Sequence, residues 1–139
     1  MPIRTVIDSC VLRTAFEGIE GEDNKKALAV LDDTDREFIA VDFVALETIP
    51  KPTFNRRQEQ VLIFSTFFNE APIHAEVSTV VTNLAIELGS VYDLDPMDAL
   101  IVSSAIISGA DELITMEKPT KPMFRVKSIK IISLYSRNQ

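Results

Sequence analysis

The sequence predicts an α/β protein, a three-layer α/β/α sandwich with a mostly parallel central sheet, formed as a single domain over residues 1–139. Short apolar segments rich in β-branched residues alternate along the chain with longer segments of helical periodicity, which is the pattern of β-α units. The 139 residues, of which 46% are hydrophobic and 25% charged, suffice for one hydrophobic core. With Cys10 as its one cysteine, the chain cannot be built on internal disulfides or on a zinc cage.

The first strand is predicted over residues 3–7, a short run of mostly β-branched residues that ends at Asp8. Ser9 is expected to cap the helix that follows, because apolar residues recur behind it at helical spacing until Gly18 and Gly21 interrupt the pattern. The further elements of this half are a helix over 24–31, a strand over 37–41 and a short helix over 42–49, which Pro50 and Pro52 stop.

A long helix is predicted over residues 53–70, where apolar side chains repeat every three to four residues until Pro72 ends it. Asp95-Pro96-Met97-Asp98 indicates a helix start, because aspartate suits the N-cap, proline the first helical position and an acid the third. The helix that begins there runs through residues 99–107 and stops at Gly109. The other elements are a strand over 73–77, a helix from Ser78 to about Gly89, and strands over 112–115 and 129–134.

Four acidic residues stand out by their places in this pattern. Asp8 follows the first strand, and Glu117 lies two residues after the strand that ends at Thr115, so both belong to the carboxyl edge where parallel sheets bind ligands. Glu47 stands among apolar neighbours, where a lone carboxylate is costly, and Asp98 opens a helix. Each also has a plain alternative: a turn or cap for Asp8, solvent exposure for Glu47 and Glu117, and helix capping for Asp98.

Together, the four carboxylates would repel one another at one edge of the sheet, and some of them would hold protons unless a cation intervened. A ligand set made only of oxygen favours Mg²⁺ or Mn²⁺ over zinc. Such a cation activates water and neutralises the charge that builds on a phosphate. The residues themselves therefore predict metal-dependent hydrolysis of phosphodiesters.

Four stretches, VIDSCVLRTAF, VALETIPKP, LDPMDALIVSSAIISGADELIT and the following MEKP, occur in the order found in one protein family and span essentially the whole chain. With them, the chain resembles the PIN-domain family of ribonucleases, which includes the VapC-like toxins of bacterial toxin–antitoxin pairs. Residue by residue, the resemblance matches Asp8, Glu47 and Asp98 to the metal-site acids of the family. It matches Ser9 and Thr115 to the small hydroxyl residues beside them.

The resemblance implies hydrolysis of RNA phosphodiester bonds, with Mg²⁺ or Mn²⁺ as cofactor. Asp8, Asp98 and Glu117 would hold the metal, and Glu117 stands where many members have the shorter aspartate. Glu47 would complete the shell or orient water. The candidates for contacts to the RNA are Lys118, Lys121 and Arg125, with Ser9 and Thr115 beside the acids; Arg56 and Arg57 are explained by solubility.

The resemblance also implies partners: RNA as the substrate and an antitoxin protein. A homodimer is expected as well, because Val61, Phe64, Phe67 and Phe68 exceed what one helix face needs, although core packing is the alternative for them. No apolar run reaches the roughly 18 residues of a membrane span. The amino-terminal segment has no signal-peptide core, which predicts a cytoplasmic protein without a membrane partner.

The charge of the chain is unevenly distributed. Its net charge of −7 argues against a generic nucleic-acid binder. Residues 118–139, however, carry six of the 14 basic residues and no acid, so a basic flank follows Glu117 directly. We interpret part of the remaining acidity as a cation-binding pocket.

Two other families with an aspartate after the first strand fit these residues less well. A dehalogenase-type phosphatase needs a second aspartate two residues after Asp8, where Cys10 stands, and a response-regulator receiver needs paired acids ahead of it. Cys10 lacks a phosphate-binding loop, so packing is its expected use. The alternative that stays open is a PIN-like protein with a weakened site that binds RNA or a protein partner without cutting.

Overall fold

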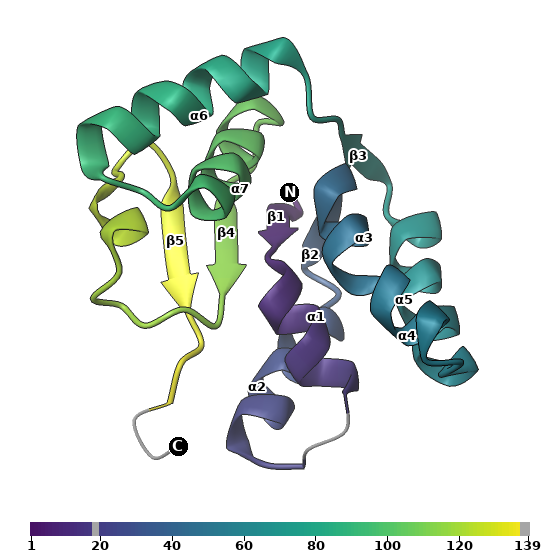
Figure 1. Cartoon of the computed structure of the whole chain (residues 1–139). Helices are drawn as coiled ribbons and strands as arrows, with labels where there is room; N and C mark the ends of the chain where they lie inside the picture. The colour runs from purple at the N-terminus through teal and green to yellow at the C-terminus, as the bar shows by residue number, and fades with distance from the viewer. Residues whose placement is uncertain (18–19, 137–139) are drawn as a thin grey trace.

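The computed structural model describes residues 1–17 and 20–136, and its strands form one sheet of five in the order β3-β2-β1-β4-β5, with β1 in the middle (Figure 1). Every neighbouring pair in this sheet is parallel, which confirms the prediction of a mostly parallel sheet. The strands are β1 (Ile3–Ile7), β2 (Arg36–Val41), β3 (Ile73–Ala75), β4 (Glu112–Thr115) and β5 (Lys130–Ser133). The helix break expected at Gly18 and the basic residue Arg137 lie outside the described residues.

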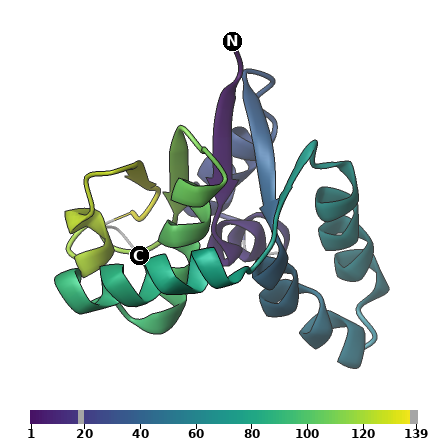
Figure 2. The same ribbon diagram turned by 90° about the horizontal axis from the view of Figure 1, so that it is seen from above.

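Helices cover both faces of the sheet, as the predicted three-layer sandwich requires (Figures 1 and 2). The helices are α1 (Ser9–Phe16), α2 (Glu22–Leu31), α3 (Asp42–Thr48), α4 (Pro50–Phe54), α5 (Gln58–Glu70), α6 (Thr79–Tyr92) and α7 (Pro96–Ile107), and a 3-10 turn, η1 (Pro122–Arg125), precedes β5. α1 packs on α2, α3 and α5, while α6 packs on α7. Within residues 1–17 and 20–136, no helix has both the length and the apolar character that crossing a membrane requires.

The order in which the chain adds strands reverses at the central strand, β1. The chain moves outward from β1 to β3 and then returns to β4 on the other side of β1. Right-handed crossovers therefore place α6 and α7 on the face opposite α1. The side chains of Val6, Ile7, Leu113 and Ile114 are at most 2% exposed, as expected for central parallel strands. The carboxyl ends of β1 and β4 thus form a topological switch point, where α/β proteins place their ligand crevices.

The start of α1 differs from the prediction, because Asp8 and not Ser9 is the N-cap. The backbone of Asp8 is extended, and its Oδ1 accepts a 2.8 Å hydrogen bond from the backbone N–H of Ser9. Aspartate and serine are about equally good N-caps, so the local sequence did not distinguish them. The cap fixes the Asp8 carboxylate at the junction between β1 and α1.

The region after α3 also differs from the prediction. Pro50 does not stop the helical path but opens α4, since proline fits the first position of a helix. The predicted helix over 53–70 is wrong in its first part, because Arg56 has a left-handed backbone (φ 56°) and α5 begins only at Gln58.

Helix α6 continues through Gly89, where the prediction ended it, and stops at Tyr92. A Cβ at Gly89 would lie 3.6 Å from the carbonyl oxygen of Leu94, which is an ordinary contact, so nothing at this position requires the helix to end. Asp93, which has a left-handed backbone (φ 59°), ends the helix instead. Asparagine and aspartate tolerate that conformation better than most residues.

The aromatic side chains of α5 belong to the core. Phe64 is fully buried and meets the ring of Phe16 edge-on at 6.1 Å between centroids. Phe68 is 8% exposed, and Phe67 packs on Phe38 at 5.9 Å. Core packing, the alternative noted for these residues, therefore accounts for them. The homodimer stays a prediction without support from this face.

Candidate active site

The site is built where the carboxyl ends of β1 and β4 lie side by side. The backbone N–H of Asp8 donates to the carbonyl of Ile114 at 3.0 Å, which extends the pairing with β4 one residue beyond the end of β1. The hydroxyl of Thr115 then donates to Oδ2 of Asp8 at 2.8 Å. Thr115 is fully buried and Asp8 is 8% exposed. The structure thus joins two residues that the sequence placed on the same rim.

The Asp8 carboxylate is buried but not isolated. Burial raises the pKa of Asp8 above its usual value, while the hydrogen bonds from Thr115 and from the backbone of Ser9 work in the opposite direction. The charge of Glu117 raises the pKa further. Both carboxylate oxygens have donors, and among the ion pairs within residues 1–17 and 20–136 none involves Asp8. Asp8 is therefore a carboxylate held in place without a counter-charge of its own.

Asp98 approaches from the first turn of α7. Its position follows from the local sequence as predicted: Oδ1 of Asp95 accepts the backbone N–H of Met97 at 3.3 Å, and Pro96 occupies the first turn. Asp98 is 9% exposed, and burial raises its pKa from 3.8 to about 6. Lys121 lowers this pKa, whereas the charges of Glu117, Asp95 and Asp8 raise it.

Glu117 lies in the loop after β4, and this loop is fixed from two sides. The backbone N–H of Glu117 donates to the Thr115 hydroxyl at 3.2 Å, and its carbonyl accepts a hydrogen bond from the Ser133 hydroxyl at 2.5 Å. Oε2 of Glu117 is 3.3 Å from the ammonium of Lys121, which is also 3.8 Å from Oδ2 of Asp98. One lysine therefore connects two of the predicted metal-site acids.

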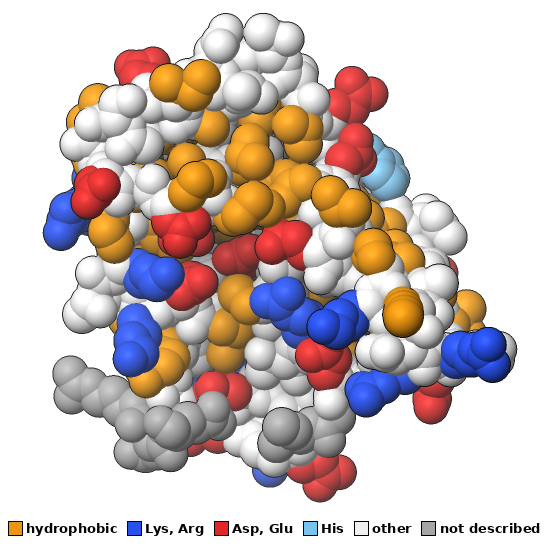
Figure 3. All heavy atoms as spheres, viewed as in Figure 1, with side chains coloured by type: hydrophobic (Ala, Val, Ile, Leu, Met, Phe, Trp, Pro, Cys, Tyr) orange, Lys and Arg blue, Asp and Glu red, His pale blue; other side chains and the backbone are white. Residues whose placement is uncertain are grey.

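Glu47, on α3, is the fourth acid, and Asp8 is the site acid whose charge acts on it. Burial and the negative charge of Asp8 raise its pKa, while the Ser9 hydroxyl and the charge of Arg13 lower it. The negative charge of Asp8 therefore raises the pKa of both Glu47 and Asp98. In Figure 3 acidic side chains occupy the middle of the molecular face, with basic side chains on either side and an apolar area above.

Arg13 is a residue that the sequence interpretation missed. It lies one helical turn after Ser9 on α1, a spacing that brings side chains onto the same face of a helix. This spacing was the available signal. Arg13 brings positive charge to the side of the site that Glu47 occupies.

The predicted basic residues are not equivalent in the structure. Lys121 contacts the carboxylates, but the ammonium of Lys118 lies 5.5 Å from the centre of the Tyr135 ring instead. Arg125 is exposed in η1. Among the ion pairs of the described residues, Arg125 and Lys118 make none with the site.

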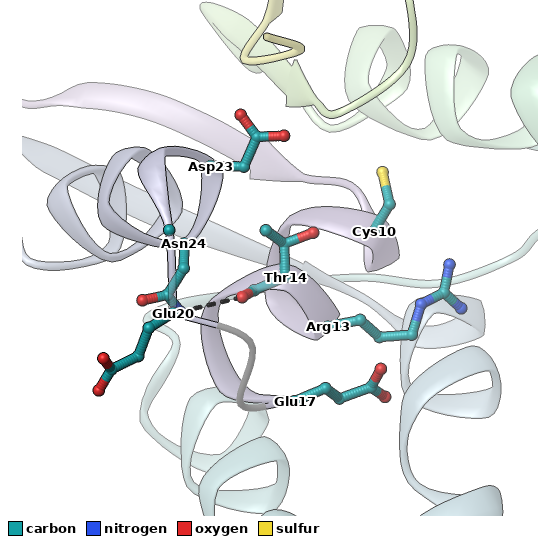
Figure 4. A pocket seen from close by; sticks show the side chains of 8 residues that line it. Cys10, Arg13, Thr14, Glu17, Glu20, Asp23 and Asn24 are labelled. Carbon is teal, nitrogen blue, oxygen red and sulfur yellow. Dashed lines mark hydrogen bonds between the residues drawn. The ribbon is translucent and has the colours of Figure 1, made fainter. Parts of the chain in front are cut away.

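A cavity of about 440 Å³ adjoins the site between α1 and α2 (Figure 4). Asn24 closes its inner end by donating to the carbonyls of Thr14 and Ala15 at 3.1 and 2.9 Å. Cys10 lies between this cavity and the site, since its Sγ is 3.5 Å from the Thr115 hydroxyl and accepts the backbone N–H of Met116. Burial and the charge of Asp8 raise the thiol pKa to about 12, so the thiol stays protonated at neutral pH. The remaining lining is polar: Arg13, Glu17, Glu20, Gly21 and Asp23.

The donor set suits a hard divalent cation, although its side chains are not arranged as a closed cage. In the part of the chain that the structure describes, no three histidine, cysteine, aspartate or glutamate side chains stand together as a ready ligand group. Mg²⁺ does not need one, because it is usually held by one or two carboxylates and several waters. The carboxylates of Asp8, Asp98 and Glu117 influence one another, and the ammonium of Lys121 already occupies part of the space between two of them. An oxygen-only set of side chains is of the kind that hard divalent cations prefer over softer ones.

Comparison with known proteins identifies the fold. No family model matches the sequence, and no curated protein matches it either. Solved structures do match: a chain of a toxin–antitoxin complex from Klebsiella pneumoniae has a TM-score of 0.71 at 17% identity, over 95% of this chain and 98% of that one. A chain of VapBC2 from Rickettsia felis, in a crystal structure with a DNA fragment from the promoter, has a TM-score of 0.68 at 15% identity, over 94% and 98%. These likenesses confirm the PIN-like α/β fold that the sequence predicted.

Proposed function

We propose that this chain is a nuclease of the toxin–antitoxin type that cuts RNA with Mg²⁺ or Mn²⁺ as cofactor. The observation that carries the proposal is the placement of Asp8, Asp98 and Glu117 around the carboxyl ends of β1 and β4, where Thr115 donates to Asp8 and Lys121 links the other two acids. The shared fold with chains of two toxin–antitoxin complexes supports the same conclusion.

In this proposal each acid has a separate task. Asp8 and Asp98 would hold the cation, and Glu117 would add a third oxygen from the loop after β4. Glu47 would orient the attacking water and accept a proton from it, because its raised pKa makes it a better base than an ordinary glutamate. When bound, the cation would lower the pKa of water, so that hydroxide is available near neutral pH, and would neutralise charge on the phosphate.

The surrounding residues would keep this arrangement in place. Thr115 and the backbone of Ser9 hold both oxygens of Asp8, so the carboxylate cannot rotate away from the site. Lys121 and Arg13 would meet the phosphates of the RNA from opposite sides of the acids. Lys118 and Arg125 would contact phosphates farther along the strand, since neither pairs with the site acids.

The test is cleavage of a defined single-stranded RNA by purified protein with Mg²⁺ or Mn²⁺. We expect Asp8→Asn and Asp98→Asn to reduce the rate by at least about 100-fold, because each removes a charged metal ligand. Asp35→Asn is the matched control: it makes the same chemical change at an exposed position just before β2, at the opposite edge of the sheet. Full cleavage by both site variants would overturn the assignment.

A non-cutting, PIN-like binding protein is the competing function, and metal binding separates the two. A nuclease should bind Mn²⁺ in a calorimetric titration and lose that binding in Asp8→Asn. A protein without any Mn²⁺ binding that still retains RNA on a filter would support the binding function instead.

We also propose an antitoxin as the protein partner. Induced expression of the chain alone should arrest growth of a bacterial host, and Asp8→Asn should abolish the arrest. Co-expression with any small protein that an adjacent gene encodes should restore growth and give a complex that co-purifies. A chain that purifies alone and has no effect on growth would favour a free-standing nuclease.

A further inference from the structure

Lys121 lies between two acids of the candidate site, Asp98 and Glu117. Its ammonium lies 3.3 Å from Oε2 of Glu117 and 3.8 Å from Oδ2 of Asp98. These two carboxylates come from different elements, the loop after β4 and the first turn of α7. A single positive charge therefore bridges two acids that would otherwise only repel each other.

Hydrogen bonds fix the backbone around Lys121, whereas its side chain is partly exposed and flexible. The N–H of Lys121 donates to the carbonyl of Lys118 at 3.0 Å, and its own carbonyl accepts from Phe124 at 3.1 Å. Pro122 follows directly and restricts the chain further. The lysine side chain is 38% exposed and has a flexible four-carbon stem. The ammonium can therefore leave the acids without any movement of the backbone.

The contact with Asp98 is loose, and the contact with Glu117, at 3.3 Å, is made by a partly exposed side chain. At 3.8 Å the ammonium is beyond hydrogen-bonding distance of Asp98, while a Mg²⁺ ion binds carboxylate oxygens at about 2.1 Å. A doubly charged ion at short distance therefore competes well against one partly exposed ammonium. The two cations cannot both neutralise the same pair of oxygens.

We propose that Lys121 is a built-in counter-cation of the site, which a divalent metal must displace from Asp98 and Glu117 in order to bind. The inference rests on the proposed nuclease function, because it concerns the same acids. Its consequence is a coupling: loading of the metal releases the ammonium at the edge of the site, where the phosphate of a substrate would lie. Lys121 thus lowers metal affinity in the free protein and becomes available to RNA only in the loaded one.

The first experiment measures Mn²⁺ affinity by calorimetry at about pH 8, where aspartate and glutamate are ionised. Lys121→Met should lower the dissociation constant about two- to fivefold, because it removes a competing ion pair. Lys121→Gln should do the same. Lys118→Met is the matched control, since it removes an identical charge one residue from Glu117 but from a side chain that lies against Tyr135. It should change the constant less than about twofold.

The second experiment follows the lysines directly. The full-length protein is treated with an amine-acetylating reagent, and the rate at each lysine is read by mass spectrometry with and without saturating Mg²⁺. Lys121 should react several-fold faster when Mg²⁺ is present, and Lys118 should not change. This measurement is independent of RNA cleavage.

The outcomes separate this inference from the nuclease proposal. Equal affinities for Lys121→Met and Lys118→Met, or an unchanged acetylation rate at Lys121, overturn the inference and leave the nuclease standing. Binding by Lys121→Met but not by the native protein supports the inference and counts against the nuclease. Absence of Mn²⁺ binding in every variant overturns both.

Discussion

The hydroxyl of Thr115 donates a 2.8 Å hydrogen bond to Oδ2 of Asp8, and so joins the ends of two strands that are more than 100 residues apart in the sequence. The same hydroxyl accepts the backbone N–H of Glu117 and lies 3.5 Å from the thiol of Cys10. A fully buried threonine therefore organises one side of the candidate site.

Replacing this hydroxyl should weaken both the fold and the site. Thr115→Val keeps the shape of the side chain but leaves Oδ2 of Asp8 without its donor, and we expect the free energy of unfolding to fall by about 2 kcal/mol. Urea denaturation measures this change. Thr115→Ser, which retains the hydroxyl, is the control and should lose less. In an Asp8→Asn background the valine effect should shrink, and an unchanged effect there would show that the hydroxyl stabilises the fold through other contacts.

The metal-free protein should become more stable when Asp98 loses its charge. Because burial raises the pKa of Asp98 from 3.8 to about 6, the folded state holds the proton more tightly than the unfolded state between these values. Stability therefore falls as the pH rises through this window. We expect Asp98→Asn to raise Tm at neutral pH in EDTA by about 2–5 °C. The difference should vanish below about pH 3, where the carboxyl is protonated in both states. A lower Tm for the variant at neutral pH would contradict this account.

Cys10 should be chemically inert in the folded protein. Burial and the charge of Asp8 raise its pKa to about 12, and only the thiolate reacts with alkylating reagents. Iodoacetamide at about pH 8 should modify the folded protein at least roughly 100-fold more slowly than the urea-unfolded chain. Mass spectrometry gives both rates. Similar rates would restore Cys10 as a candidate nucleophile.

The opposite edge of the sheet holds a buried ion pair that supports the fold and not the site. Nε of Arg36 lies 2.8 Å from Oε2 of Glu112, which is 3% exposed and also accepts the hydroxyl of Thr5 at 2.9 Å. Arg36→Met leaves this carboxylate buried without a counter-charge, so the free energy of unfolding should fall by about 3 kcal/mol.

The control for this change is Arg4→Met. Arg4 is paired with Glu37 at 3.8 Å on the surface, and its loss should cost less than about 1 kcal/mol. The affinity for Mn²⁺, measured below the unfolding transition, should be the same in both arginine variants. A weakened Mn²⁺ affinity in Arg36→Met would show that the two edges of the sheet are coupled.

Most strands and the start of α7 could be predicted because their signals are local. The residues over 3–7 and 112–115 are short apolar runs, and both are strands with the predicted bounds. Asp95 and Pro96 fix the start of α7 through capping and backbone preference, which depend on neighbours in the sequence.

The errors arose where two local preferences were close in energy. Either Asp8 or Ser9 suits an N-cap, and Pro50 suits the beginning of a helix as well as the end of one. In the segment around Arg56, the predicted helix crosses a residue with a left-handed backbone, and α5 begins only at Gln58. The sequence has no glycine there that would indicate a left-handed backbone.

By itself, the sequence determined the order of strands and helices, the parallel sheet and the presence of acids at strand ends and a helix start, since these follow from periodicity, capping and topology. Only the tertiary structure decided which groups meet around those acids: Thr115 at Asp8, Arg13 on the side of Glu47, and Lys121 between Asp98 and Glu117. Such contacts depend on the register of β1 against β4 and on the path of the loop after β4. Those are set by packing across the whole sheet, and no local pattern encodes them.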